Sequence, residues 1–369
     1  MQSDLQILQE KVGQGKRLNF DDGLRLFKSA DVLSIGKLAQ KIRVWIHGKK
    51  VYYFLNFHLN PTNICTVRCD FCAFSRDRKD PDAYALSLAE IGEKITEAVS
   101  KWGIREVHMV GGHNPDLGLD YYEELFGQIS RDFPDICIKA LSAPEIHYIA
   151  QRSGLSVEAT LRRLKEAGLQ SLPGGGAEIF ESQIREQICP QKITGKEWLE
   201  IHRIAHRLGI PTNATMLYGH IENDEDRVNH LLQLRELQDE TGGFQAFVPL
   251  AYQPAADSFS LKRETEFSTT GFMDLKMLSI SRLLLDNIPH IKVHWPATDL
   301  KFAQTAVSFG ADDIGGTNFG EQVMHEAGSE APAELSPQDL VRLIEDAGYE
   351  PCLVNSYYQP IKESKKNVR

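Results

Sequence analysis

The sequence predicts an α/β protein: a (β/α)8 TIM-type barrel with extra helices before it and a helical extension after it. Apolar, β-rich runs alternate with amphipathic helical segments over about 270 residues, which is the pattern of a parallel sheet covered by helices. Eight such runs are present, and polar or glycine-rich residues repeatedly follow them. An open, doubly wound sheet is the alternative architecture, because it shows the same alternation.

Residues 1–50 are expected to form an N-terminal helical segment. One helix begins at Asp21 and Asp22, and a second begins at Asp31, after which apolar residues recur with roughly helical spacing. Residues 51–328 are assigned to the barrel, whose strands are expected at 52–58, 106–110, 136–141, 169–172, 212–218, 244–250, 291–295 and 311–314.

Helices are expected between these strands. The sequence Ser87-Leu-Ala-Glu90 is a capping box that begins one of them, and others cover 227–237 and 272–285. The first of these helices has one apolar face, made of Leu88, Ile91, Ile95 and Val99.

Residues 329–369 are expected to form a C-terminal extension. Its last helix, at 336–347, has Pro337 in the first turn and Gly348 after its end, as helix-capping chemistry prefers. We expect this helix to lie outside the barrel.

Composition and charge narrow the class of protein. The net charge of −10 and the pI near 5.7 argue against a nucleic-acid partner, since phosphate binding requires a basic face. No run of about 18 apolar residues is present, and residues 1–16 lack the apolar core of a secretory signal. We therefore expect no membrane partner and a cytoplasmic location, which the clustered cysteines fit. The other thiols are expected to be buried as small apolar residues: Cys137, Cys189 and Cys352.

Cys65, Cys69 and Cys72 lie in the sequence Cys-Thr-Val-Arg-Cys-Asp-Phe-Cys, directly after the first strand-like run. Three thiolates on one short loop can hold three irons of a [4Fe-4S] cluster, which normally takes four cysteine ligands, so that one iron stays open for a small molecule. A closed zinc site needs four ligands, and His58 or His113 would have to complete it. A disulfide is disfavoured, because nothing in the sequence indicates secretion.

The spacing of these cysteines, with an aromatic residue before the last one, resembles the radical S-adenosylmethionine superfamily. In that superfamily the open iron binds the amine and carboxylate of S-adenosylmethionine, and an electron from the cluster cleaves the sulfonium to a 5′-deoxyadenosyl radical. Phe71 matches the aromatic residue that flanks the adenine, although loop packing would also explain it. Gly111 and Gly112 match the glycine-rich turn that approaches the amine, with His113 where the motif usually has Glu.

Two further residues at strand ends are candidates for contacts with S-adenosylmethionine. Ser142 follows the third expected strand and is a candidate for the ribose or the carboxylate, although a turn serine is an equal alternative. The run Pro173-Gly-Gly-Gly-Ala-Glu178 suits a backbone pressed against a ligand, with the Glu178 carboxylate accepting from ribose hydroxyls. A flexible loop with a solvated Glu is the alternative.

Other polar residues are candidates for substrate contacts. His220 follows the fifth expected strand and can act as an acid or base near neutral pH, with a structural histidine as the alternative. Arg282 and Arg185 are candidate partners for an anionic substrate, because guanidinium pairs bidentately with carboxylates, although most arginines are solvated.

A longer set of motifs, from about residue 58 to 328, is similar to the aminodeoxyfutalosine synthase family of the futalosine route to menaquinone. The stretches that carry the resemblance are 58–65, 174–180, 188–192, 198–202 with 205–206, 213–222 and 237–245. The dehypoxanthine futalosine cyclase of the same pathway shares some of them, whereas 58–61, 188–189 and 217–220 favour the synthase. More distant relatives make a deazaflavin chromophore.

The resemblance implies that the adenosyl radical adds to the vinyl carbon of 3-[(1-carboxyvinyl)oxy]benzoate. The captured radical then rearranges, a carboxylate is lost as bicarbonate, and 6-amino-6-deoxyfutalosine and methionine are released, so that S-adenosylmethionine is consumed. Arg282, His58 and His220 are the candidates for handling this doubly anionic substrate, and flavodoxin or ferredoxin is the expected electron donor. Two alternatives stay open: a cyclase that abstracts hydrogen and closes a ring, and a non-catalytic iron–sulfur or zinc-binding protein.

Overall fold

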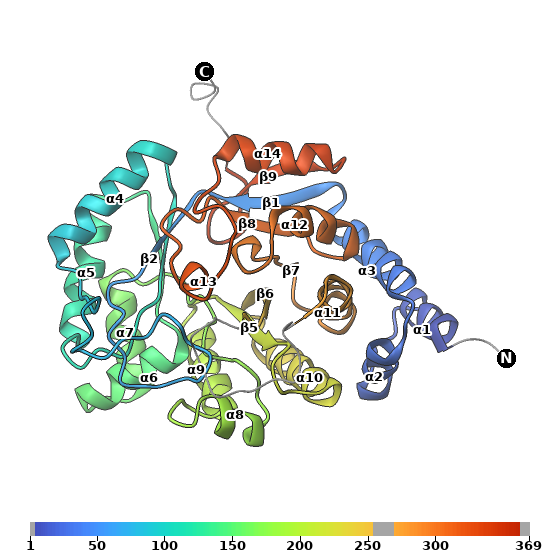
Figure 1. Ribbon diagram of the computed structural model, residues 1–369, viewed down its shortest axis with the longest axis horizontal. Helices are drawn as coiled ribbons and strands as arrows, with labels where there is room; N and C mark the ends of the chain where they lie inside the picture. Colours follow the sequence, from blue (N-terminus) through green and yellow to red (C-terminus); the bar gives the residue numbers. More distant parts are fainter. Residues whose placement is uncertain (1–3, 254–268, 362–369) are drawn as a thin grey trace.

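The computed structural model describes residues 4–253 and 269–361, in which helices surround a ring of parallel strands (Figure 1). The strands are β1 (Lys50–Phe54), β2 (Asn56–Leu59), β3 (Glu106–Met109), β4 (Cys137–Ala140), β5 (Thr212–Tyr218), β6 (Phe244–Ala251), β7 (His290–Ile291), β8 (Asp313–Gly316) and β9 (Glu350–Leu353). The helices are α1 (Asp4–Gly13), α2 (Phe20–Lys28), α3 (Val32–His47), α4 (Leu88–Trp102), α5 (Leu119–Asp132), α6 (Ala143–Ser153), α7 (Val157–Ala167), α8 (Ser182–Ile188), α9 (Gly195–Arg207), α10 (Asp224–Thr241), α11 (Gly271–Leu284), α12 (Leu300–Ala306), α13 (Val323–Glu326) and α14 (Pro337–Asp346), with short 3-10 turns at Trp295–Ala297 and Val307–Phe309.

The strands form three parallel sheets that join into one closed barrel. Their orders are β8-β1-β9, β2-β3-β4 and β5-β6-β7. Three single parallel bridges connect the sheets: Lys139–Ser171, Leu172–Thr212 and Lys292–Asp313. Because β1 and β2 are two halves of one strand, interrupted only at Leu55, the ring closes. The predicted barrel is therefore confirmed, with residues 169–172 supplying its fourth position through bridges alone.

The helix that begins after Ser87 shows how local sequence sets the elements. The Ser87 side chain accepts from the Glu90 backbone N–H, and the Glu90 carboxylate accepts from the Ser87 N–H, so the predicted capping box forms at the start of α4. Ile91 and Ile95 are buried as expected. Val99 was expected on the same face but is 36% exposed, because the helix turns Ala98 inward at that level.

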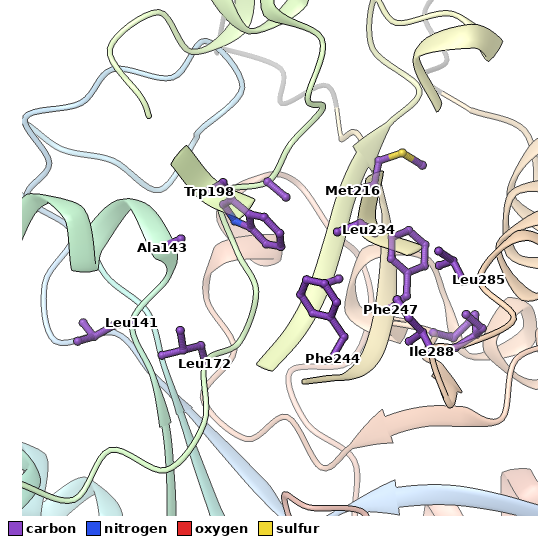
Figure 2. Close-up of a cluster of buried hydrophobic side chains, with 14 of the residues drawn as sticks. Leu141, Ala143, Leu172, Trp198, Met216, Leu234, Phe244, Phe247, Leu285 and Ile288 are labelled. Atoms are coloured by element: carbon purple, nitrogen blue, oxygen red, sulfur yellow. The ribbon is translucent and has the colours of Figure 1, made fainter. Parts of the chain in front are cut away.

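Apolar side chains fill the layer between the barrel wall and the helices (Figure 2). Phe247 on β6 lies beside Leu285 and Ile288, and Phe244 on the same strand stacks with Trp198 of α9 at 6.1 Å between ring centroids. Side chains alternate between the two faces of a strand. Phe244 and Phe247 are three positions apart and reach the same layer because the register between β5 and β6 shifts between them. The strands therefore bury apolar residues outside the barrel and direct the residues between them into its lumen.

The lumen is polar and charged. Lys139 on β4 and Lys292 after β7 come from separate sheets, yet their ammonium groups lie 5.5 and 4.5 Å from the centroid of the Phe54 ring on β1. This convergence requires all three side chains to point inward. Lys139 pairs with Glu106 at 2.8 Å, and Lys292 lies 3.8 Å from Asp313, so each buried cation has a carboxylate partner.

The C-terminal segment contributes to the barrel as well as lying beside it. α14 packs outside, beside α12 and β9 in Figure 1, but β9 adds a parallel strand to β1, which the sequence did not predict. Beyond β9, the Tyr358 hydroxyl donates to Asp313 at 2.6 Å and its ring stacks on His290 at 3.7 Å. This segment therefore closes the amino end of the barrel, and the expected domain boundaries at 50/51 and 328/329 stay predictions. Among the described helices, none has the length and apolar content needed to span a membrane.

Candidate functional site

The three cysteines of the sequence motif lie on the loop between β2 and α4, at the carboxyl end of the barrel strands. Cys65, Cys69 and Cys72 are all free thiols, and Cys69 is buried. The Cys65 sulfur accepts from the backbone N–H of His113 at 3.4 Å, and its thiol donates to the Val67 carbonyl at 3.2 Å. We call residues 60–76 the cysteine loop.

The turn after β3 supports this loop by direct backbone contact. The Gly112 N–H donates to the Thr62 carbonyl at 3.0 Å, and a Cβ at position 112 would lie 2.1 Å from the Ile64 carbonyl oxygen. Position 112 therefore requires glycine for close approach to the cysteine loop. The Gly111 N–H donates to Glu145 at 2.9 Å. The predicted contact of both glycines with S-adenosylmethionine stays a prediction.

The thiols fit a [4Fe-4S] cluster in their chemistry. Burial raises the pKa of Cys65, and burial raises the pKa of Cys69 to about 12, so both thiols resist ionisation in the absence of a cation. Cluster irons supply that positive charge, and the N–H donor from His113 suits a ligand sulfur. No group of three ligand atoms close enough for a single metal ion occurs on the cysteine loop within the described residues, so a preformed zinc site is not present there.

A second segment packs against the cysteine loop and was missed by sequence reasoning. The Asp70 N–H donates to the Ile188 carbonyl at 2.8 Å, at the end of α8. Cys189 is buried beside the loop and near enough to raise the pKa of Cys69. Lys192 Nζ donates to Glu178 at 2.6 Å and lies 5.2 Å from the centroid of the Phe71 ring. The signal available in the sequence was the stretch 188–192, which carries the family resemblance.

Lys192 thus joins two of the predicted cofactor contacts, Phe71 and Glu178. Its ammonium group also acts to lower the pKa of Cys69, so it lies at the junction of the aromatic residue, the carboxylate and the thiol. A buried cation beside cluster ligands stabilises negative charge on them. The structure therefore adds Lys192 to the residues that can act on the bound cofactor.

The glycine-rich loop before α8 is held by Arg185, which corrects its predicted role. The Arg185 guanidinium is buried and donates to the carbonyls of Ala177 and Ile179 at 2.5 and 3.0 Å, and to that of Ile193 at 2.5 Å. A guanidinium engaged by backbone carbonyls inside the loop does not face an anionic substrate. Its contribution is to fix the loop on which Glu178 sits at a φ of +45°.

Ser142 caps α6 and is tied to the turn at Gly111 through Glu145. The Ser142 hydroxyl donates to Glu145 at 2.5 Å, while the other carboxylate oxygen accepts from Gly111. Burial raises the pKa of Glu145 to about 7. The Ser142 hydroxyl proton is therefore already engaged, and its predicted contact with S-adenosylmethionine would use the oxygen as acceptor.

His220 lies in a buried network after β5. Its Nδ1 is 3.1 Å from Glu222 and its Nε2 is 3.0 Å from the Leu217 carbonyl. Burial acts to raise the pKa of Glu222, but His220 and Arg227 lower it overall, and Arg227 donates to the carboxylate at 2.6 Å. Both ring nitrogens of His220 thus have partners, and its predicted catalytic role stays untested.

Arg282 lies at the opposite end of the barrel from the cysteine loop, which contradicts its predicted substrate contact. It is buried, pairs with Asp312 and donates to the Gly310 carbonyl at 3.0 Å. Asp312 precedes β8 and also accepts from His290 at 2.6 Å, at the start of β7. Parallel strands begin at the same end, so this network lies at the amino end of the barrel.

The same network contains the single close group of potential metal ligands found among residues 4–253 and 269–361: His47, His290 and Asp312. The two nitrogens of His47 contact Tyr52 at 3.3 Å and the Pro289 carbonyl at 2.9 Å, and Asp312 pairs with Arg282. Hydrogen bonds and a guanidinium cation therefore already satisfy these groups. The network stabilises the barrel end and does not form a metal site.

His58 lies near the carboxyl end of β2 and points into the lumen below the cysteine loop. Its ring stacks on that of His108, with 4.5 Å between ring centroids. The structure thus places His58 near the carboxyl end, unlike Arg282. Cys65, Phe71, Gly112, Glu178 and His58 all belong to that end of the barrel.

Comparison with known proteins agrees with this geometry. Residues 59–234 match the family described as the radical SAM superfamily, and residues 241–367 match the family described as the CofH/MqnC C-terminal region. The chain is similar in fold to methylornithine synthase (PylB), with a TM-score of 0.75, 17% identity, and 93% of this chain and 97% of the other covered. It is also similar in fold to the hydrogenase maturase HydG, with a TM-score of 0.76 and 18% identity, and with 96% of this chain and 76% of HydG covered.

Curated relatives give a closer likeness. The aminodeoxyfutalosine synthase of Thermus thermophilus is 42% identical over 96% of this chain and 95% of its own length, and that of Streptomyces coelicolor is 40% identical over 96% and 94%. A 5-amino-6-(D-ribitylamino)uracil–L-tyrosine 4-hydroxyphenyl transferase of Methanopyrus kandleri is 38% identical over 90% of both chains. The chain therefore belongs to the radical S-adenosylmethionine enzymes and, among them, to the aminodeoxyfutalosine synthase family, whose cofactors are a [4Fe-4S] cluster and S-adenosylmethionine.

Proposed function

We propose that this enzyme joins the 5′-deoxyadenosyl group of S-adenosylmethionine to 3-[(1-carboxyvinyl)oxy]benzoate. The balanced reaction consumes S-adenosylmethionine, the enolpyruvyl benzoate and water, and gives 6-amino-6-deoxyfutalosine, methionine, bicarbonate and a proton. The bound cluster supplies the electron that cleaves the sulfonium. The observation that carries this proposal is the 42% identity to an aminodeoxyfutalosine synthase along nearly the whole chain, combined with the three-cysteine loop.

The residues of the carboxyl end divide between two tasks in this proposal. Cys65, Cys69 and Cys72 would hold three irons of the cluster, and the remaining iron would be available to the amine and carboxylate of S-adenosylmethionine. The residues that bind the rest of this nucleotide are Phe71, Gly111, Gly112, Ser142 and Glu178. Close alignment of two bound reactants is the main contribution that protein residues make to such a bimolecular addition.

The acceptor side of the reaction is assigned to His58 and His220. Both are histidines near the carboxyl end of the barrel, and His58 reaches into the lumen beneath the cysteine loop. The His58 imidazole can donate a hydrogen bond to a carboxylate without carrying a permanent charge. His220, whose nitrogens already face Glu222 and the Leu217 carbonyl, would have to exchange one of these partners to do the same. The electron donor in this proposal is a flavodoxin or ferredoxin, and the enzyme works in the cytoplasm.

The test is product identification with anaerobically reconstituted, dithionite-reduced protein. Incubation with S-adenosylmethionine and 3-[(1-carboxyvinyl)oxy]benzoate should give an adenosylated product with the mass of 6-amino-6-deoxyfutalosine, together with equimolar methionine. Free 5′-deoxyadenosine without an adenosylated product would contradict the proposal and favour hydrogen abstraction, as in a cyclase.

A second candidate function follows from the relatives that are named as hydroxyphenyl transferases. Proteins called 5-amino-6-(D-ribitylamino)uracil–L-tyrosine 4-hydroxyphenyl transferase are 38 and 39% identical to this chain over 90% of it. The same assay, run with L-tyrosine and the uracil in place of the benzoate, separates the two functions. A product from tyrosine and none from the benzoate would assign the chain to that activity instead.

A further inference from the structure

Three imidazole rings stand in a row inside the barrel, directly beneath the cysteine loop. His58 and His108 are register neighbours on β2 and β3, and their rings are parallel, with an interplanar angle of 3° and 4.5 Å between centroids. His294, after β7, continues the row at 6.0 Å from His58 and an angle of 21°. We call these three residues the imidazole row.

Two rings of the row have nitrogens without hydrogen-bond partners in the described part of the chain. Within residues 4–253 and 269–361, no side chain or backbone group forms a hydrogen bond with the ring of His108 or His294. All three rings remain partly accessible although they lie inside the barrel. Beside His58, Asn318 is 1% exposed, and its side-chain Nδ2 meets no acceptor at hydrogen-bond distance among the described residues. The Asn318 side chain nevertheless lies close enough to the His58 ring to raise its pKa. Buried donors are nearly always bonded, so this set indicates a site for water or a ligand.

The backbone of Asn318 adopts a strained conformation that holds its side chain in this position. Asn318 has a φ of +45°, and its carbonyl oxygen Oδ1 accepts from the Asn56 side chain at 3.0 Å, which directs Nδ2 away from Asn56. Non-glycine residues with positive φ persist where the surrounding structure holds them, and they gather at ligand sites. The unpartnered amide is therefore fixed in place.

The charges beneath the row balance one another. Lys139 and Lys292 face the lumen, and their partners Glu106 and Asp313 balance them in number. Asp313 is also bound by the Tyr358 hydroxyl. The two carboxylates are thus engaged, and each neutral imidazole of the row can still supply one N–H donor.

A metal ion does not fit the row. The described residues offer one group of three close metal ligands, and it is not this one. Rings that stack face to face direct their nitrogens along parallel planes, whereas a zinc ion needs ligand atoms that converge on one point. The row therefore suits a planar acceptor with two oxygens.

We propose that His58, His108 and His294, with the amide of Asn318, bind the ring carboxylate of an aromatic acid that enters the lumen from the cysteine-loop end. This proposal rests on the proposed function and extends it, because it orients the acceptor: the benzoate end lies in the lumen and the alkene end faces the cysteine loop. His108 and His294 become binding residues that no sequence motif singled out.

Proton uptake should accompany this binding. Burial lowers the pKa of each ring, and nearby Lys292 lowers all three further. Lys139 also lowers the pKa of His108, whereas Glu106 and Asn318 act to raise that of His58 without offsetting the effect of burial. The rings are therefore neutral in the free protein. A carboxylate beside them raises these pKa values, so the complex takes up protons from the buffer.

The test measures binding of 3-(carboxymethoxy)benzoate, which keeps both carboxylates but has no alkene to react. Titration calorimetry uses the anaerobically reconstituted enzyme with S-adenosylmethionine, and phenoxyacetate, which lacks the ring carboxylate, is the control probe. His108→Phe and His294→Phe each keep a flat ring and remove the nitrogens. Each should weaken binding of the benzoate probe at least tenfold and change that of phenoxyacetate less than twofold. The wild type should show a binding heat that depends on the ionisation enthalpy of the buffer.

Each variant is used only with a wild-type iron content and a wild-type spectral response to S-adenosylmethionine. The two substituted residues come from different parts of the barrel, β3 and the segment after β7. Unchanged affinity, an equal loss for both probes, or no binding to the wild type would overturn the proposal. The proposed function is tested separately by product mass: adenosylated product with an unaltered KM in both variants refutes only the imidazole row. If the variants lose binding of the benzoate probe selectively but the wild type forms no adenosylated product, the proposed reaction is refuted and the imidazole row is not.

Discussion

Replacing Gly112 with alanine should disturb the cysteine loop from a position outside it. The new Cβ would lie 2.1 Å from the Ile64 carbonyl oxygen and 3.0 Å from Cys65 Cβ, whereas ordinary contact begins near 3.4 Å. The first of these neighbours is backbone, so no side-chain rotation relieves the overlap. Overpacking of this kind costs about 1–3 kcal/mol. Because the atoms that must move flank Cys65, the cluster ligand should shift with them.

The assay combines iron and sulfide analysis with urea unfolding of the anaerobically reconstituted protein. We expect Gly112→Ala to bind less than half of the roughly four irons per chain held by the wild type, and to lose about 2 kcal/mol of unfolding free energy. Gly92→Ala is the matched control: its Cβ meets Gln128 at an ordinary 3.4 Å, inside α4. That change should keep the iron content and add up to about 1 kcal/mol of stability.

Normal iron content and stability in Gly112→Ala would refute this reasoning. It would mean that the turn after β3 can retreat from the cysteine loop without cost. A loss of stability with full iron content would separate the two effects, since the strain would then be absorbed on the side of the turn and not at Cys65.

Four other outcomes follow from the structure. Cys72→Ala should lose the cluster, read as iron content and the electron paramagnetic resonance signal after reduction; retained signal would exclude Cys72 as a ligand. Lys192→Met removes a positive charge beside Cys69 and should lower the midpoint potential of the cluster by on the order of 50 mV relative to Lys192→Arg, which keeps the charge. Equal potentials in the two variants would show that Lys192 does not act on the cluster. Lys139→Met leaves Glu106 buried without its partner and should cost about 3–5 kcal/mol in urea unfolding. Burial raises the pKa of Glu145 from 4.5 to about 7, so between these pH values the folded state holds a proton that the unfolded state has lost. The unfolding free energy of the wild type should therefore fall by up to about 3 kcal/mol as the pH rises through that interval. Glu145→Gln should abolish this pH dependence.

Much of the barrel could be predicted because its signals are local. The capping box at Ser87 and Glu90 closes over four residues, and it formed as expected. The bridged segment 169–172 was also found from its apolar run, whereas the strand expected at 291–295 overlaps the short strand β7 at Ile291 alone. β9 was missed because its residues pair with β1, about 300 positions earlier, and nothing within the segment itself indicates that partner.

The roles of the candidate site residues also depended on contacts that are distant in sequence. Arg185 and Arg282 looked alike in sequence as free cations, but one is engaged by backbone carbonyls of its own loop and the other pairs with Asp312 at the amino end of the barrel. Lys192 gave no signal of its own, although it contacts Glu178 and faces Phe71. Whether a charged side chain is free depends on partners supplied by other segments.

The sequence alone determined the metal chemistry of this protein, because three thiols on one loop carry their ligand spacing within eight residues. It also determined the strand–helix alternation, since side-chain periodicity and helix caps act over a few positions. Only the tertiary structure decided which polar groups share a space: that Gly112 presses on the cysteine loop, and that His58, His108 and His294 form one row. The reason is geometric. Closure of the barrel places strands that are distant in sequence around one lumen. Burial in that lumen then determines whether each side chain is charged and which of its polar atoms have no partner.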